Sequence, residues 1–193
     1  MEVTTLNVEL TFETEMLGTA PKDPEVYRTY IESKKPEGIN EEEYLTVEKV
    51  EEKGWSGFRS DENGLFIMEY MIMGFLKNVG NILKDTNEIK IKNLRSKLSN
   101  YVFVSPRRIY LGKKEPDGVE ERPLRAMTMQ GPRVTLARSD YINEQTVIGF
   151  QIKIIENKEI TPELIMKLLD YGEYCGLGQF RNGGYGRFRY VIT

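Results

Sequence analysis

The chain of 193 residues contains no histidine and one cysteine, Cys175. Without histidine it lacks the commonest general base, the Ser/His and Cys/His nucleophile pairs and the ordinary zinc ligands. A lone cysteine forms no disulfide within the chain, which is typical of a reducing compartment. No spacing of Asp and Glu residues argues for a metal-assisted site. We therefore expect a binding protein and not an enzyme, with no cofactor and no bound metal.

Long apolar runs and a basic leader are also missing. The run from Met71 to Leu76 is far too short to cross a bilayer. The N-terminus, Met-Glu-Val-Thr-Thr, lacks the basic segment of a signal peptide. Together with 39% hydrophobic and 30% charged residues, these features predict a cytoplasmic protein without a membrane partner. The length suits a single domain, 1–193, with room for large insertions.

Charge is distributed unevenly along the chain. Residues 1–64 contain 16 acidic and 7 basic side chains, whereas residues 65–193 contain 14 acidic and 20 basic ones. A basic part joined to an acidic one can bind polyanions on one face, and ordinary surface charge is the alternative.

Hydrophobic periodicity divides the chain into elements. Alternation predicts strands at 3–12, 101–111, 146–155 and 187–192, and a short extended segment at 55–59. Apolar residues at three- and four-residue steps predict the strongest helix at 67–83. Capping signals predict a helix after Thr161 and two more at 24–34 and 40–54.

Two excursions interrupt this order of elements. The first, at about 17–66, is acidic and predicted to be helical, and the second, at about 112–145, contains an arginine-rich arm. Without them the order is strand, helix, strand, strand, helix, strand. This is the split βαβ plan of a ferredoxin-like, RRM-like sheet with helices on one face. We therefore predict an α+β fold with a βαββαβ core and two large insertions.

The arm is recognised by its composition. Residues 122–138 include Arg122, Arg125, Arg133 and Arg138 but no acidic residue. We expect an extended hairpin that clamps a bound strand or a neighbouring subunit. A hairpin that merely exposes its arginines is the alternative.

A glycine-rich run connects the last predicted helix to the last strand. Five glycines fall within the eleven residues 176–186, with Arg181 inside the run and Arg187 beside it. Glycine permits positive φ and close backbone approach, and N–H groups beside arginines can hold phosphate without a metal. A tight turn whose glycines only relieve steric crowding is the alternative.

The spacing Gly176-x-Gly178, five residues, Gly184-x-Gly186, followed by Arg187 and Phe188, resembles the C-terminal loop of the RAMP proteins. These are RNA-binding subunits of CRISPR effector and processing complexes with ferredoxin-like folds. Residues 71–77 resemble the helix start of their backbone subunits, which polymerise along guide RNA, and Leu17-Gly18 resembles their first loop. The resemblance implies RNA binding, a protein partner in a defence complex and homo-oligomer formation.

The chain also departs from the RAMP pattern. The processing endonucleases of that superfamily use a histidine base, which is absent here. Backbone subunits that cut target RNA use an aspartate after the first strand. Asp23 is the acid at that place, with a helix N-cap as its other interpretation. Residues 17–27 and 177–182 resemble an uncharacterised family of phage and prophage proteins, which implies a bacterial host cell.

The leading hypothesis is non-catalytic binding of RNA, or another single-stranded nucleic acid, across the sheet and the glycine run. Backbone N–H groups and Arg181 would hold phosphates, while Phe180 and Tyr185 would stack on bases. One alternative is an anti-defence protein that mimics or binds a CRISPR effector subunit, and another sequesters a small phosphorylated nucleotide. The candidate binding residues are Gly176, Gly178, Phe180, Arg181, Gly183, Gly184, Tyr185, Gly186, Arg187, Lys77, Arg107, Arg108, Arg125 and Arg133.

Overall fold

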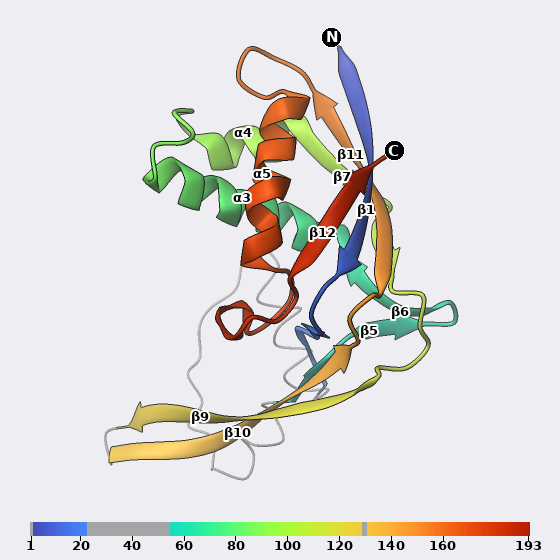
Figure 1. The fold of residues 1–193 in the computed structure, drawn as a ribbon, viewed down its shortest axis with the longest axis vertical. Coiled ribbons are helices and arrows are strands. Elements are labelled where there is room, and N and C mark those ends of the chain that lie inside the picture. Colours follow the sequence, from blue (N-terminus) through green and yellow to red (C-terminus); the bar gives the residue numbers. More distant parts are fainter. Residues whose placement is uncertain (1, 23–54, 129–130) are drawn as a thin grey trace, which may run out of the picture.

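The computed structural model describes residues 2–22, 55–128 and 131–193. The helices predicted at 24–34 and 40–54, and Asp23, lie outside the described residues. Figure 1 shows a sheet with helices on one side and a long hairpin that extends away from them.

The central sheet has four strands in the order β12 (Phe188–Ile192), β1 (Val3–Phe12), β11 (Val147–Ile155) and β7 (Val102–Ser105). All three neighbouring pairs are antiparallel. The strands follow from the alternating pattern, which gives each one a face to bury. In β1 every second residue from Leu6 to Phe12 is buried, and β11 buries its own alternate residues in the same way.

The connectivity of this sheet confirms the predicted fold class. Its elements follow in the order β1, α3 (Glu69–Asp85), β7, β11, α5 (Pro162–Cys175) and β12. Since β11 lies between β1 and β7, the first crossover is split by a later strand. The fold is therefore α+β with a ferredoxin-like βαββαβ core. The division into a single domain with two insertions stays a prediction.

The helices cover one face of the central sheet (Figure 1). α5 begins where its capping signal predicts, because the Thr161 hydroxyl accepts a hydrogen bond from the Leu164 N–H at 3.3 Å. The rings of Phe75 on α3 and Phe188 on β12 meet edge to face, with centroids 5.6 Å apart. Among the described residues, no helix has the length and apolar content needed to span a membrane.

The prediction of a helix over 67–83 is wrong at its start. β6 (Gly64–Met68) occupies the first part of that range, and α3 begins at Glu69. Every residue of β6 is buried. A short apolar run that is buried on all sides shows neither the helical nor the strand period, so the pattern does not distinguish the two.

The single strand predicted at 101–111 is also wrong, because two strands in two different sheets occupy this range. β7 pairs with β11, whereas β8 (Arg108–Tyr110) pairs with β6. Pro106 lies between them and has no N–H to donate to a strand ladder. The preceding helix α4 (Leu94–Tyr101) was not predicted, since it buries two residues, Leu94 and Leu98, which are too few to show a period.

Two smaller sheets complete the described structure. One contains β5 (Arg59–Asp61), β6 and β8. The other contains β2 (Met16–Leu17), β10 (Gly131–Ile142), β4 (Trp55–Gly57) and β3 (Ala20–Pro21), with β9 (Gly118–Thr128) paired along β10. The pairing of β9 with β10 confirms the predicted hairpin, which we call the arm. It reaches away from the helices at the foot of Figure 1.

Candidate functional site

The glycine-rich run forms a compact loop between α5 and β12. Gly176 ends α5 with a φ of 71°, and Arg181–Gly183 form a 3₁₀ turn, η1. Gly186 has a φ of 72°, and a Cβ there would lie 1.8 Å from the Leu177 carbonyl oxygen. Such an approach leaves no room for a side chain, so glycine is required at this position.

The predicted use of the loop's backbone N–H groups as a phosphate cradle needs correction. The N–H groups of Gly183 and Gly184 donate to carbonyls of the same turn, at 2.9 Å each. The Gly186 N–H donates to the Glu15 carbonyl at 2.8 Å, which ties the loop to the chain after β1. Because these donors are already used inside the protein, anion binding in the loop rests on the side chain of Arg181.

A hollow of about 380 Å³ lies between this loop and α3. Its polar side chains are those of Thr19, of Asn78 and Asn81 on α3, of Arg95 on α4 and of Arg181 in the loop, and no acidic residue of the described chain lines it. Guanidinium and amide donors without a competing carboxylate suit a phosphate group. We call this hollow the α3 cleft, and its lining residues are Thr19, Met71, Gly74, Phe75, Asn78, Asn81, Arg95, Leu177, Gly178 and Arg181.

Phe180 and Tyr185, which were predicted to stack on bases, contact each other and the base of the arm. Their ring centroids are 5.7 Å apart. The Tyr185 hydroxyl donates to Oε1 of Glu120 on β9 at 2.8 Å, a hydrogen bond that raises the pKa of Tyr185. Phe180 is 44% exposed, so part of its ring is open to a base, whereas Tyr185 is half-buried and held in place.

Arg122 is not one of the exposed arginines expected on the arm, since it is only 6% exposed. Its Nη2 donates to Ser139 Oγ at 2.9 Å, and its guanidinium lies 4.5 Å from the centre of the Phe180 ring. Burial lowers the pKa of Arg122, and among the described residues its Nε and Nη1 have no hydrogen-bond partner. The Ser139 hydroxyl also donates to Gln179 at 2.8 Å. These contacts fasten the arm to the glycine-rich loop.

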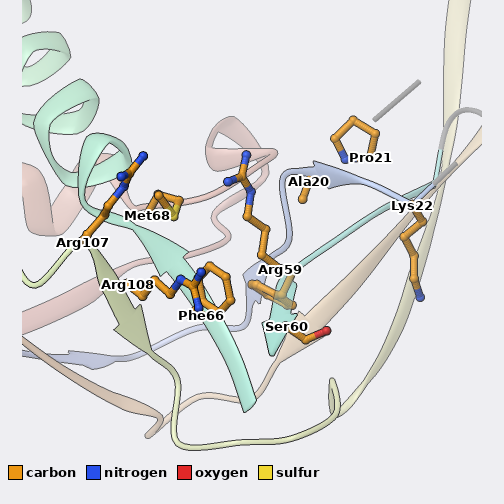
Figure 2. Close-up of a pocket in the computed structure, with 10 residues that line it drawn as sticks. Ala20, Pro21, Lys22, Arg59, Ser60, Phe66, Met68, Arg107 and Arg108 are labelled. Atoms are coloured by element: carbon orange, nitrogen blue, oxygen red, sulfur yellow. The ribbon is translucent and has the colours of Figure 1, made fainter. Parts of the chain in front are cut away.

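A second hollow, of about 730 Å³, lies between β3, β5, β6 and β8 (Figure 2). It contains the predicted residues Arg107 and Arg108, together with Lys22 and Arg59, which were not predicted. It shares no lining residue with the α3 cleft, although a smaller hollow adjoins both, lined by Thr19 and Met71 of the cleft and by Phe58 and Met68 of this second hollow. We call it the arginine pocket, and its lining residues are Ala20, Pro21, Lys22, Phe58, Arg59, Ser60, Phe66, Met68, Arg107 and Arg108.

Carboxylates of the described residues pair with Arg108 and Lys22 in the arginine pocket. Nη1 of Arg108 lies 2.6 Å from Asp61 Oδ2, a hydrogen bond that raises the pKa of Arg108. Nζ of Lys22 lies 2.8 Å from Oδ2 of Asp140, whose side chain is 5% exposed. In Figure 2 the Lys22 side chain points away from the other cations, while Arg59 and Arg107 reach toward the same side of the pocket.

The remaining predicted residues lie outside both hollows. Lys77 is half-buried on α3, and Arg187 is exposed just before β12. Arg125 lies on β9 opposite Val134, and Arg133 lies on β10 opposite Ala126. In the part of the chain that the structure describes, no group of three or more Cys, Asp or Glu side chains is placed to hold a metal ion.

The open face of the central sheet, opposite the helices, lines neither hollow. Its exposed side chains include Phe103, Val147 and Val191, with exposed fractions of 48%, 45% and 58%. Its exposed Arg189 lies 3.7 Å from Glu13. The two basic hollows thus lie beside α3 and the smaller sheets, and the α3 cleft includes Gly178 and Arg181 of the glycine run on which nucleic-acid binding was predicted.

Comparisons with known proteins identify a shared fold. No family model matches the sequence, and no curated protein matches it. A chain of a Type III-B Cmr-beta complex, solved by cryo-electron microscopy with cognate target RNA bound, is similar with a TM-score of 0.55 and 14% identity. The match covers 99% of this chain and 61% of that one, so this protein spans less than two thirds of its length. A chain of a Type IV-B CRISPR complex is similar with a TM-score of 0.50 and 10% identity, covering 98% of this chain and 90% of that one.

Proposed function

We propose that this protein binds RNA, or another single-stranded nucleic acid, without cleaving it, and that the α3 cleft holds the phosphates. The observation that carries the proposal is the lining of the cleft. Arg95 and Arg181, from distant parts of the chain, converge with two asparagine amides where no described acidic residue competes. Charge-assisted hydrogen bonds from arginine are the strong contacts to phosphate, and they tolerate any base sequence.

Two further observations support this proposal. The ferredoxin-like fold is shared with a chain of a complex that was solved with target RNA bound. Phe180, within the glycine-rich loop, keeps 44% of its surface exposed, and aromatic stacking on bases adds sequence-tolerant affinity. Both similar structures are multi-subunit complexes, so the proposal includes a protein partner for this chain. The phage setting and the anti-defence role remain predictions.

Fluorescence anisotropy with labelled oligouridylates of increasing length tests the proposal. Affinity should rise with length and fall with salt, and Arg181→Ala should weaken binding by about tenfold, or about 1.4 kcal/mol. The slope of log affinity against log salt should decrease by about 0.7, because one phosphate contact is lost. Arg189→Ala, which removes an exposed arginine from the open sheet face, is the matched control and should change the affinity by less than about twofold.

Two results would contradict the proposal. Equal losses for Arg181→Ala and Arg189→Ala would mean that the cleft has no special role and that overall charge attracts the strand. No binding of oligouridylates, together with a stable complex formed with a protein partner, would favour the alternative in which the chain mimics or binds a CRISPR effector subunit.

A further inference from the structure

The glycines inside α3 and α5 differ in what surrounds them. A Cβ at Gly80 would lie 2.9 Å from Cδ2 of Leu94, and a Cβ at Gly172 would lie 2.2 Å from Cζ of Phe75. These two glycines let the helices pack closely. A Cβ at Gly74 would meet nothing within 4 Å among the described residues, and the φ of this exposed residue is not positive. The packing of the described chain therefore gives no reason for glycine at position 74.

Glycine at position 74 weakens the helix that contains it. α3 begins at Glu69 and continues to Asp85, so Gly74 lies in the helix interior. There glycine is the least favourable residue after proline, because it loses the most conformational freedom on folding. Alanine would fit the described structure and stabilise the helix. A glycine that relieves no crowding inside the protein is explained when another molecule approaches the helix backbone closely.

The surface around Gly74 indicates what approaches it. Gly74 lines the α3 cleft. So do Met71, Asn78 and Asn81, which stand three residues before it and four and seven residues after it. Residues at such steps share one face of a helix, so Gly74 lies in the middle of the face that α3 contributes to the cleft. The amides of this face and the two guanidinium groups of the cleft are donors that suit phosphate oxygens.

Gly149 on β11 shows that open space alone does not make a site. A Cβ there would also meet nothing within 4 Å, and its φ is not positive either. However, Gly149 lies on the open face of the central sheet, opposite Glu9 of β1, and lines neither hollow. A carboxylate at that place repels phosphate. Of these two glycines, Gly74 is the one that combines an open helix backbone with donors for an anion.

We propose that the sugar–phosphate backbone of a single strand lies directly on the main chain of α3 at Gly74. The inference rests on the proposed function, since it concerns the same strand in the same cleft. The phosphate next to this contact is held by Arg181 and by the amides of Asn78 and Asn81. A Cβ at position 74 would occupy the place of strand atoms and keep the strand farther from these donors. Because hydrogen bonds weaken as their geometry is lost, one methyl group lowers the affinity.

Gly74→Ala tests this contact with two measurements that should change in opposite senses. Alanine stabilises a helix interior, so the unfolding temperature should rise by about 2–4 °C. Fluorescence anisotropy with labelled oligouridylate should show an affinity about tenfold lower, because the added methyl group overfills the contact. Oligoadenylate should lose the same factor, since the strand backbone and not the base meets residue 74.

Gly149→Ala is the matched control for this substitution. It adds the same Cβ in open space, also at a φ that alanine accepts, but on a face without a hollow. It should change the affinity for either oligonucleotide by less than about twofold.

The possible results distinguish this inference from the proposed function. If Gly74→Ala stays within about twofold of the parent while Arg181→Ala weakens binding by about tenfold, the function stands and the inference is overturned. A lower unfolding temperature for Gly74→Ala would also overturn it, because the protein's own packing would then require the glycine. A loss with one base only would mean that a base lies at residue 74, against the inference. If neither Gly74→Ala nor Arg181→Ala changes binding, both the proposed function and the inference are wrong.

Discussion

The α3 cleft and the arginine pocket both collect arginines, but they hold them in different ways. In the cleft, Arg95 and Arg181 have no ion-pair partner within the described residues. In the pocket, Asp61 and Asp140 fix the positions of Arg108 and Lys22. Unpaired cations on a groove attract a polyanion through a salt-sensitive field, whereas a cation held by a carboxylate has much of its charge already balanced inside the protein.

The two places also depend on glycine to different degrees. One wall of the α3 cleft is the glycine-rich loop, whose path requires residues with positive φ. The arginine pocket is built from strands β5, β6 and β8, whose backbone hydrogen bonds hold it without such residues in its lining. Disturbing the loop should therefore disable the cleft first.

The largest expected effect comes from Gly186→Ala. The added Cβ would lie 1.8 Å from the Leu177 carbonyl oxygen, and the φ of Gly186, 72°, is one that alanine rarely adopts. The loop therefore cannot keep its backbone conformation. We expect a loss of about 3 kcal/mol or more in the free energy of unfolding, measured by urea denaturation. Gly184→Ala is the matched control, because its φ is 89° but a Cβ there would meet nothing within 4 Å, and it should cost about 1 kcal/mol.

Equal unfolding midpoints for Gly186→Ala and Gly184→Ala would show that the loop accommodates a Cβ at either position. The conclusion that the α3 cleft depends on glycine would then be wrong. If Gly186→Ala folds, oligouridylate binding should fall, because the loop lines the α3 cleft.

A double-substitution cycle with Arg107→Ala and Arg181→Ala tests whether the two hollows act separately on one strand. With an oligonucleotide long enough to reach both, each change should weaken binding by about tenfold and the pair by about a hundredfold. The lining residues do not overlap, so the two losses should add. If the affinity of the double variant for the oligonucleotide equals that of the weaker-binding single variant, the two arginines serve one shared contact.

Much of the core was predictable because its signals are local. The alternation in β1 and β11, the Thr161 cap of α5 and the order of elements lead directly to the ferredoxin-like sheet. The arm was likewise found from its composition and confirmed as a hairpin. β6 was mistaken for the start of a helix, because a fully buried run carries no period.

The candidate sites were less predictable, since they depend on which distant segments meet. Arg181 and the loop stood out by composition, but nothing in the sequence indicated that Arg95 would line the same cleft. Likewise Arg59 joins Arg107 only through the pairing of β6 with β5 and β8. In the sequence Arg122 cannot be distinguished from the other arginines of the arm. Only its contacts with Phe180 and Ser139 show that it holds the arm to the loop.

The smallest expected effect uses Cys175 as a reporter of the α3 cleft. Burial raises the pKa of the Cys175 thiol, and the positive charge of Arg181 opposes that rise. Arg181→Ala should therefore raise this pKa further and slow alkylation by iodoacetamide at mildly alkaline pH by about twofold, because the thiolate is the reactive form. Mass spectrometry of timed reactions measures the rate.

Bound oligouridylate should slow the same reaction, since phosphates at Arg181 cancel its charge. The Arg181→Ala variant distinguishes two causes of slower alkylation, the loss of the Arg181 charge and physical blocking of the Cys175 thiol by the strand. If the oligonucleotide is added at saturating concentration to Arg181→Ala and still slows alkylation as much as in the parent protein, the strand covers Cys175 physically. If the slowing disappears, its cause is the charge of Arg181.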